Sequence, residues 1–536
     1  MISDEIRLLR RKDEERGSVR TDDVVIPDQS RMGRLTRILL LVAAVAMGIY
    51  YFAWLLNPDR VETLALFIAL VTADLFNFSH AITFWILLSV RHRHNSTEHP
   101  PKTPLDPSAT VDIFVPTLNE SREVLERTLR SCAAVRWPKL GVYVLDDGAR
   151  DWVKALADEL SIGYLRRHTN RGAKAGNIND ALRETCGDFV LVFDADHAPG
   201  SDFLERTMPE FADPRVAVVQ TPQVYGNLRE STIAFASKQQ QDLFYQTILP
   251  GKDGLGGTFS CGTNVIYRRT ALEDVNGVAE DSIVEDMKTS MLLHARGWRM
   301  VYVHENLAVG LGPVHIQSFW RQQRRWASGC LGLLASRALW TPRLSPAKKW
   351  HYLTSLSYFA SGWPVLTYSI LPILRLFFGW SAVDRHTDEF VLRFAPYFGL
   401  SLLILGVQMQ GRYGFQGLLM HWGSFSVHIV ATWDAVFSRH LRFRVTPKSL
   451  QEGSHLRYLW PNLLIVLLSG AAIIYGLAGD MSPSTINNAA FAVFNAVVVG
   501  GIIVLAYQKQ GPAVELDQVA HHRVRAPVQS PETSIQ

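Results

Sequence analysis

The chain has 536 residues, of which 48% are hydrophobic, with a mean hydropathy of +0.05 and a formal net charge of +4. This apolar content exceeds what a soluble enzyme of this length usually shows, so we expect a membrane protein. The Lys and Arg residues cluster beside apolar runs instead of forming one basic stripe, which argues against nucleic acid as a partner.

Six apolar runs are long enough to cross a bilayer, because a spanning helix needs about 20 mostly apolar residues. They cover 36–56, 63–89, 352–378, 391–410, 459–479 and 487–507. We therefore expect two membrane helices within 35–90, two within 351–410 and two within 458–508. The charged segment 1–34 and the tail 509–536 are expected to be cytosolic. The first run is expected to be an anchor, because it carries no signal-peptide cleavage site.

A further apolar segment, 415–437, is better explained as an amphipathic helix in the plane of the membrane interface. Its apolar residues recur at helical spacing, whereas polar residues such as His421 and His428 fall on the other side. The following loop, 438–457, is rich in arginine, and basic loops stay in the cytoplasm. This gives six crossings of a plasma (inner) membrane, with the N-terminus and the soluble insert in the cytosol.

The soluble insert, 95–320, is followed by expected interface helices over 321–350. Its short apolar runs alternate with helical stretches, which predicts buried parallel strands. The strands are expected at Val111–Val115, Val142–Leu145, Phe189–Phe193 and Ala217–Val219. The expected fold is an α/β domain inserted in a multi-helix transmembrane region, with about six membrane-spanning helices plus amphipathic interface helices.

Two acidic pairs, Asp146-Asp147 and Asp194-Ala195-Asp196, each follow one of these strands. Ligands of open α/β sheets gather at the carboxyl ends of the strands, so the four acids should meet in one crevice. Taken alone, Asp146-Asp147-Gly148 is equally typical of a turn. The second pair suits a sugar diphosphate, because Mg²⁺ is usually held by one or two carboxylates together with phosphate oxygens of the substrate.

The segment Asn170–Asn177, between the two acidic pairs, combines small residues with Lys174. Small residues let a ligand approach the backbone, and Lys174 could meet a diphosphate as a point charge. A glycine-bearing start of a helix explains the segment equally well when it is considered by itself.

Val284-Glu285-Asp286 supplies two candidate catalytic carboxylates. Inverting sugar transfer needs a base within hydrogen-bond reach of the attacking hydroxyl, and we expect Asp286 to be that base, with Glu285 beside it. The alternative is a solvated acid at the start of a helix, where negative charge is favoured.

The last motif is Gln322-Gln323-Arg324-Arg325-Trp326. Arg325 offers a planar fork for phosphate, and Trp326 offers a flat face on which a sugar ring can stack. An interfacial Arg and Trp helix anchored by lipid headgroups is the competing explanation, and the two can hold together.

With these motifs in this order, the chain resembles the processive family 2 glycosyltransferases of the cellulose synthase superfamily. The resemblance runs from about Val111 to Lys448. It rests on Pro116–Glu120, Val142–Gly148, Lys174–Asn177, Asp194–Asp196, Val219–Pro222, Val284–Asp286 and Gln322–Trp326. It implies a GT-A-type glycosyltransferase domain, a Mg²⁺ ion with Mn²⁺ as the alternative, and a channel of flanking helices through which a growing polymer leaves.

The resemblance also assigns roles to individual residues. Asp194 and Asp196 would hold the metal, and the following would bind substrate: Thr117, Asn119, Glu120, Asp146, Asp147, Lys174, Gly262, Thr263, Asn264, Gln322, Arg325, Trp326, Phe443, Thr446 and Lys448. The last three lie in a loop, 438–457, that resembles the gating loop over the donor site of cellulose synthases. Accessory secretion subunits are among the expected partners, and the tail is too short for a PilZ-type cyclic-di-GMP domain.

Two departures from the cellulose pattern concern the product. Val284 stands where bacterial cellulose synthases have Thr, and Phe259–Asn264 differs from their acceptor segment at its end. A compact synthase with these changes resembles the bacterial β-1,3-glucan (curdlan) synthases, which implies UDP-glucose as donor and a nascent β-glucan as acceptor. The alternatives are a cellulose, mixed-linkage, chitin or hyaluronan synthase, a non-processive lipid-linked sugar transferase, and a catalytically silent scaffold or transporter.

Overall fold

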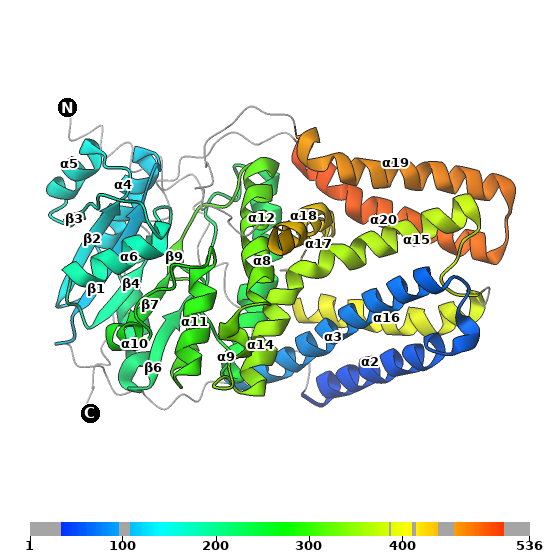
Figure 1. Cartoon of the computed structure of the whole chain (residues 1–536), viewed down its shortest axis with the longest axis horizontal. Helices are drawn as coiled ribbons and strands as arrows, with labels where there is room; N and C mark the ends of the chain where they lie inside the picture. The colour runs from blue at the N-terminus through cyan, green and yellow to red at the C-terminus, as the bar shows by residue number, and fades with distance from the viewer. Residues whose placement is uncertain (1–33, 96–107, 385–386, 410–413, 438–454, 509–536) are drawn as a thin grey trace, which may run out of the picture.

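The computed structural model describes residues 34–95, 108–384, 387–409, 414–437 and 455–508. Figure 1 shows an α/β domain at one end of the long axis, apolar helices at the other, and a layer of helices between them. Residues 1–33, 438–454 and 509–536 lie outside the described part of the chain. The gating-loop residues expected from the sequence, Phe443, Thr446 and Lys448, therefore also lie outside it.

The α/β domain is built on a seven-stranded sheet with the order β3-β2-β1-β4-β7-β6-β8. The strands are β1 (Val111–Thr117), β2 (Leu140–Asp146), β3 (Gly163–Leu165), β4 (Phe189–Val192), β6 (Val216–Gln220), β7 (Val265–Arg268) and β8 (Arg299–Tyr302). The four strands expected from the sequence, β1, β2, β4 and β6, are present and point in one direction. The sheet is nevertheless mixed, because β7 lies between β4 and β6 and runs antiparallel to both. Strand β7 was not expected, because its apolar run is only three residues long, Val265–Tyr267, and follows a polar segment.

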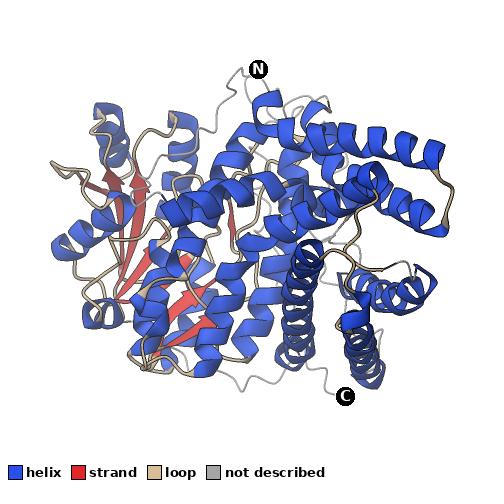
Figure 2. Cartoon of the chain, turned by 45° about the vertical axis from the view of Figure 1, so that its right-hand side comes forward, coloured by secondary structure: helices blue, strands red, loops and turns tan. Residues whose placement is uncertain are grey.

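Helices cover both faces of this sheet, as Figure 2 shows. They are α4 (Arg122–Ala133), α5 (Asp151–Glu159), α6 (Ala173–Glu184), α7 (Phe203–Thr207), η4 (Met208–Ala212), α10 (Arg269–Asp274) and α11 (Glu285–Ala295). Alternation along β1 separates the two cores: Ile113 packs with Leu125 of α4, whereas Phe114 packs with Ile178 of α6. A small antiparallel pair, β5 (Ala198–Pro199) and β9 (Ala308–Val309), lies directly after β4.

A layer of helices joins this domain to the apolar helices (Figure 1). It contains α8 (Thr232–Leu243), the π-helical turn η5 (Phe244–Ile248), α9 (Leu249–Gly254), α12 (Ile316–Leu333), α13 (Arg337–Trp340) and α14 (Pro346–Ser357). Helix α12 begins at Ile316, where His315 and Ser318 form a reciprocal cap, five residues before the interface helices were expected to begin. The sequence analysis also placed no interface helix in the region of α8 and α9.

The apolar helices are α2 (Arg34–Leu55), α3 (Leu64–Asn95), α15 (Gly362–Phe378), α16 (Thr387–Met409), α19 (Leu456–Gly479) and α20 (Pro483–Tyr507). Within the described residues, all of these except α15 are long and apolar enough to cross a membrane, which makes five. The run expected at 352–378 is divided among α14, the 3₁₀ turn η6 (Tyr358–Ser361) and the 17 residues of α15. Pro364 explains the change of winding, since it has no N–H to donate to the carbonyl of residue 360.

The amphipathic segment forms two helices, α17 (Phe415–Gly423) and α18 (Phe425–Phe437). Figure 1 shows them nearly end-on, while α19 and α20 run across the view, so they lie at a steep angle to the apolar helices. Their polar side does not face outward. The ring of His421 forms a hydrogen bond with the hydroxyl of Tyr358, and the ring of His428 forms one with the hydroxyl of Ser361, both in η6. The outward side carries the exposed apolar residues Phe415, Trp433, Val436 and Phe437.

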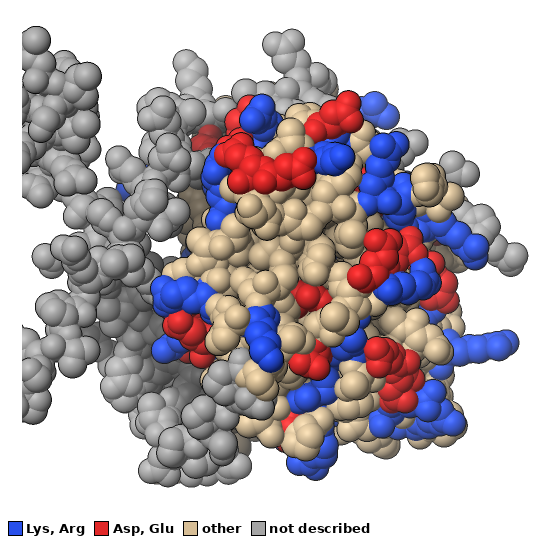
Figure 3. All heavy atoms as spheres, turned by 90° about the vertical axis from the view of Figure 1, so that its left-hand side faces the viewer, with Lys and Arg blue, Asp and Glu red and all other residues tan. Residues whose placement is uncertain are grey.

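Figure 3 shows the face of the α/β domain farthest from the apolar helices. Blue and red side chains lie next to each other around a broad uncharged area, so cations and anions are intermixed on this face. The same mixing is seen in surface ion pairs of the domain, such as Arg136 with Glu205 and Arg206 with Glu305.

Candidate active site

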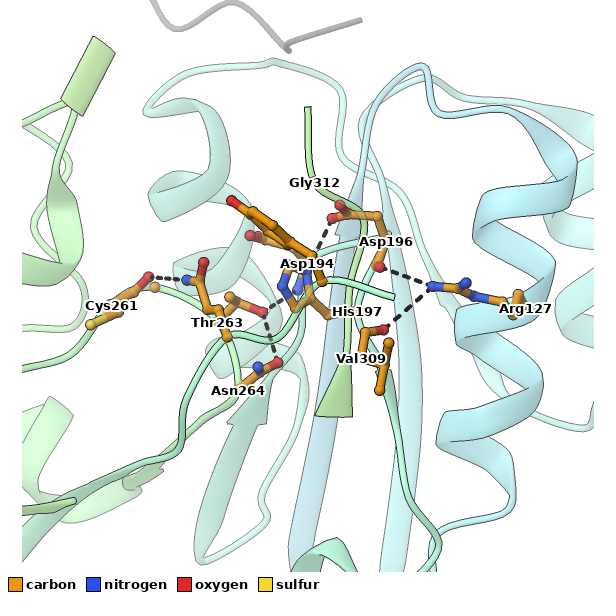
Figure 4. A network of polar contacts seen from close by, with 12 residues as sticks. Arg127, Asp194, Asp196, His197, Cys261, Thr263, Asn264, Val309 and Gly312 are labelled. Carbon is orange, nitrogen blue, oxygen red and sulfur yellow. Dashed lines mark hydrogen bonds and ion pairs between the residues drawn. The ribbon is translucent and has the colours of Figure 1, made fainter. Parts of the chain in front are cut away.

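Asp194, Asp196 and His197 follow β4 and form one group of potential metal ligands. One ligand atom from each lies within 4.8 Å of the others, and no comparably tight group of other residues is found in the described part of the chain. Figure 4 shows the three side chains together, with Thr263 and Asn264 beside them and Arg127 reaching in from α4. Arg127 donates hydrogen bonds to the carbonyl oxygens of Asp196 and Val309, which fixes the backbone after the acidic pair.

The chemistry of this group fits a divalent cation. The two carboxylates suit Mg²⁺ or Mn²⁺, and the imidazole is a ligand type that transition metals accept. Burial lowers the pKa of His197 to about 4, so the ring is neutral at pH 7, the form that binds metals. Its Nδ1 contacts Asp196 at 3.2 Å, while its Nε2 is buried and has no hydrogen-bond partner among the described residues. The sequence analysis named both acids but not His197, although it directly follows Asp196.

Lys174 connects this group to the expected base. Its ammonium contacts Asp194 and donates a hydrogen bond to the carbonyl oxygen of Gly262 at 2.7 Å. Gly262 has a positive φ of 81°, and a Cβ built there would lie 3.0 Å from Asp286 Oδ2. The ammonium of Lys174 therefore lies between the two carboxylates: it contacts Asp194 directly, and it contacts the Gly262 backbone, which lies against Asp286.

The pKa values of Lys174 and Asp286 depend on burial, on each other's charge and on the charges of Asp194 and Glu285. Burial raises the pKa of Asp286, and the neighbouring charge of Glu285 raises it further, whereas Lys174 lowers it. Burial alone would lower the pKa of Lys174, but the charges of Asp194, Glu285 and Asp286 raise it above its ordinary value. Glu285 and Asp286 occupy the first turn of α11, as the helix-start alternative expected, but Asp286 is partly buried and not a solvated acid.

Thr263 and Asn264, expected to bind the acceptor, are fully buried. The hydroxyl of Thr263 accepts the backbone N–H of Asp194 at 2.8 Å, and the Asn264 amide donates to the carbonyl of Pro222 at 3.0 Å. Gln220 ties the same segment together, because it donates to the carbonyl of Thr263 and accepts from the N–H of Cys261. These side chains thus hold the start of β7 against the acidic pair.

Asp146 and Asp147 are each engaged by an arginine that the sequence analysis did not single out. Asp146, at the end of β2, accepts hydrogen bonds from the Arg150 guanidinium at 2.9 and 3.1 Å. Arg167 forms a bidentate pair with Asp147 at 2.5 and 2.7 Å and also donates to the carbonyl of Ala173, next to Lys174. The two acidic pairs are therefore connected through the start of α6.

The segment after β1 joins the same network. Glu120 accepts from the Thr117 hydroxyl at 2.6 Å and from the backbone N–H groups of Leu118 and Asn119. Arg150 donates to the carbonyl of Glu120 and to the Thr117 hydroxyl. The sequence contains one signal for this network, the spacing of four residues between Asp146 and Arg150. The other partners of Arg150, Thr117 and Glu120, lie about 30 residues before it in the chain.

Replacing Arg150 by alanine is expected to destabilise the domain and weaken nucleotide binding. The Asp146 side chain is fully buried and would lose its cation, and breaking a buried pair typically costs about 3–5 kcal/mol. Thermal unfolding and titration with UDP would measure both effects. As the control, Arg122→Ala removes an exposed pair with Glu126 and should change neither; equal losses in the two variants would contradict the expectation.

Helix α12 contacts the site through two residues. The side chain of Gln322 lies beside the hydroxyl of Tyr225, which accepts a hydrogen bond from Gln241 at 2.6 Å and whose pKa burial raises to about 12. Tyr225 pairs with Gly310, and a Cβ at Gly310 would lie 2.3 Å from Nε2 of His197. Farther along α12, Gly329 packs on Val284, two residues before Asp286. Arg325 and Trp326 are half-buried in the turn between these contacts.

Comparison with known families agrees with this geometry. Residues 112–275 match the family described as glycosyl transferase family 2, and residues 273–430 match the family described as cellulose synthase. The two matches meet between β7 and α11, so the acidic pairs fall in the first and Asp286 with Gln322–Trp326 in the second.

The chain is 30% identical to cellulose synthase 2 of Novacetimonas hansenii over 84% of its length, covering 29% of that protein. It is 32% identical to a UDP-forming cellulose synthase catalytic subunit of Pseudomonas fluorescens, over 65% of this chain and 48% of that one. A Pyrobaculum calidifontis mannosyltransferase, solved with GDP-Man and Mn²⁺, superimposes with a TM-score of 0.49 and 18% identity, covering 70% and 99% of the two chains.

The chain spans about 30% of the length of the first three curated relatives. Its mixed sheet, with the acidic pairs after β2 and β4, and its match to glycosyl transferase family 2 define a GT-A-type fold. The apolar helices that could span a membrane complete the architecture. The chain therefore carries a glycosyl transferase family 2 domain followed by a cellulose synthase domain, and its relatives are cellulose synthases.

Proposed function

We propose that this protein is a processive, inverting glycosyltransferase that polymerises glucose from UDP-glucose into a β-glucan. The observation that carries the proposal is the contact of Lys174 with both Asp194 and the carbonyl of Gly262, which lies against Asp286. Asp194, which would act on the diphosphate, and Asp286, which can remove a proton, are thereby held on either side of the Lys174 side chain.

In this proposal, the residues divide the work of transfer. Asp194, Asp196 and His197 would hold a divalent ion, Mg²⁺ or Mn²⁺, which when bound would supply positive charge beside the departing UDP. Lys174 adds a second positive charge beside Asp194. Asp286 takes the proton from the attacking acceptor hydroxyl, and its raised pKa makes it a stronger base than an exposed aspartate.

Substrate recognition is divided between two sides of the site. Asp147, set by Arg167, would contact the nucleotide, and the fully buried Asp146 would act through Arg150 and the backbone that follows β2. The acceptor end would lie against α12, where Gln322, Arg325 and Trp326 form one turn. The loop with Phe443, Thr446 and Lys448 would cover the donor, as the family resemblance implies.

The membrane part of the proposal has six crossings of the plasma (inner) membrane and a cytosolic catalytic domain. Its support is the layered arrangement in Figure 1, in which α15 runs beside α19 and α20, together with the basic residues Arg337, Arg343 and Lys349 next to α14. With η6, α15 reaches the lower end of the length that a spanning helix needs. The polymer would leave between these helices.

Two linkages have specific support. The curated relatives are cellulose synthases, which favours a β-1,4 product. The substitutions at Val284 and Asn264 favour a β-1,3 product, as in curdlan. Both side chains are buried, so they would act on the acceptor only by shifting the backbone, before β7 for Asn264 and at the start of α11 for Val284.

Digestion of the product tests the function and the linkage together. Purified protein in lipid would receive UDP-glucose and Mg²⁺, and the release of UDP and the formation of polymer would be followed. We expect UDP release and a polymer that either an endo-β-1,3-glucanase or an endo-β-1,4-glucanase degrades, and the enzyme that degrades it identifies the linkage.

UDP release without polymer would indicate a non-processive transferase, and no UDP release from any UDP-sugar would indicate a scaffold or transporter. Polymer made only from UDP-N-acetylglucosamine, alone or with UDP-glucuronate, would indicate chitin or hyaluronan.

A further inference from the structure

Arg324 lies inside the Gln322–Trp326 motif but takes no part in the contacts of that motif with the catalytic domain. Its guanidinium donates two hydrogen bonds to Asp434 of α18, Nε to Oδ2 at 2.6 Å and Nη2 to Oδ1 at 2.8 Å. The Asp434 side chain is 8% exposed, and Ser328 lies 3.4 Å from its Oδ2. Bidentate arginine–carboxylate pairs of this kind fix geometry as well as charge.

The ion pair and the site contacts lie on opposite sides of α12. Each residue turns an α-helix by about 100°, so positions 322, 326 and 329 share one face and positions 324 and 328 share the opposite one. The contacts agree with this: Gln322 and Gly329 meet Tyr225 and Val284, whereas Arg324 and Ser328 meet Asp434.

The face of α12 with the ion pair is held by a second contact. The Arg324 guanidinium lies 5.5 Å from the centre of the Trp320 ring, and Trp320 packs against Tyr458 of α19. Arg324 is thus fixed between α18, through its charge, and α19, through the ring of Trp320. Both helices follow α12 in the chain by about a hundred residues, so the contact depends on the tertiary fold.

We propose that the Arg324–Asp434 pair is a positioning pair that sets the rotation of α12 and so holds the Gln322, Arg325 and Trp326 face toward the transfer site. The inference rests on the proposed function of that site. Arg324 occupies one of the two unspecified positions of the Gln-x-x-Arg-Trp element, so the motif itself assigns it no role. A rotation of α12 that moved this face by about 1 Å would be enough to cost on the order of 100-fold in transfer.

The test compares Asp434→Asn, Arg324→Lys and the exchange variant Arg324→Asp with Asp434→Arg. Arg136→Ala is the matched control, because it removes a bidentate pair with Glu205 at 2.9 and 3.0 Å on the surface of the catalytic domain. Three quantities are measured for each protein: the affinity for UDP with Mg²⁺, the rate of UDP release, and the ratio of UDP released to glucose incorporated into polymer.

We expect Asp434→Asn and Arg324→Lys to lower polymer formation about 10- to 100-fold while UDP affinity stays within about twofold. The ratio of UDP released to glucose incorporated should rise, because a donor held next to a misplaced acceptor reacts with water instead. The exchange variant should restore the ratio at least in part, and the control should behave as the wild type.

Two results would overturn the inference: normal polymer formation in both single variants, or a parallel loss of UDP binding, UDP release and polymer with the ratio unchanged. The second result would show that the pair only supports folding. A wild-type protein that releases no UDP would instead overturn the proposed function, so the two failures are distinguishable.

Discussion

Replacing Asp286 by asparagine is expected to lower sugar transfer by about 10²- to 10⁴-fold, the contribution typical of a positioned general base. Asparagine keeps the size of the side chain and its hydrogen bond to the N–H of Met287, but it cannot take a proton. UDP affinity should remain within about twofold, because the nucleotide-side residues are untouched. Steady-state UDP release and equilibrium UDP binding would measure the two quantities.

Asp281→Asn is the matched control for this substitution. Asp281 lies five positions before Asp286, and its side chain is 74% exposed and paired with Lys288. The control should keep its transfer rate. Transfer by the Asp286→Asn protein at the wild-type rate would remove Asp286 as the base and leave Glu285 as the candidate.

The same carboxylate predicts the pH dependence of transfer. Burial, together with the charge of Glu285, raises the pKa of Asp286 to about 7. A base acts only when deprotonated, so kcat/KM should rise with pH up to about 7 and fall roughly tenfold per pH unit below it. Glu285→Gln removes a negative neighbour, which lowers the pKa of Asp286 and should move this limb to lower pH. A limb that stayed in place would mean that another group controls it.

Asp196→Asn is expected to abolish metal-dependent binding of UDP. Asp196 is one of three clustered ligands, and even changes in the outer shell of a metal site commonly cost about 10- to 100-fold in metal affinity. We therefore expect UDP affinity in the presence of Mn²⁺ or Mg²⁺ to fall by at least about 100-fold, to the level of wild type in EDTA. Calorimetric titration measures this without any need for turnover.

Asp158→Asn, at the exposed end of α5, is the control for this loss, and its UDP affinity should equal that of the wild type. Comparison of Mg²⁺ with Mn²⁺ in the same titration would show which ion the site prefers. If wild-type binding of UDP were insensitive to EDTA, the metal role of Asp194, Asp196 and His197 would be excluded.

The sequence predicted those features of the fold that depend on local patterns. Apolar runs located the long helices, and short apolar stretches located β1, β2, β4 and β6. The order of the acidic motifs predicted the GT-A-type domain through the family resemblance. The short β7, the interface helices α8 and α9, and the turn that divides 352–378 were not predicted. β7, α9 and the turn are short or irregular, so their own residues do not show a complete period. Helix α8 has 12 residues, but its second half, Lys238–Asp242, is polar throughout, so no apolar repeat runs along its whole length.

The site was predicted to a similar extent. Motif residues such as Asp194 and Asp286 were identified because acids directly follow apolar strands or begin a helix. Lys174, the partner of Asp194, was identified as well. The partners of Asp146, Asp147 and Arg324 were not, since Arg150, Arg167 and Asp434 belong to no recognisable pattern. The arginine singled out from the sequence was Arg325, whereas the bidentate pair that anchors α12 is formed by Arg324.

The sequence by itself thus determined the class of the protein: an apolar chain with one α/β insert and carboxylates at the ends of its strands. The tertiary structure decided which charges meet, as in the contact of Lys174 with Asp194 and Gly262 and the pairing of Arg324 with Asp434. The physical reason is range. Helical and strand periodicity are patterns among near neighbours in the chain, so the sequence shows them directly. A polar contact needs only proximity in space. The partners Lys174 and Gly262 are 88 residues apart in the chain, and Arg324 and Asp434 are 110 apart, so only the folded structure shows that they meet.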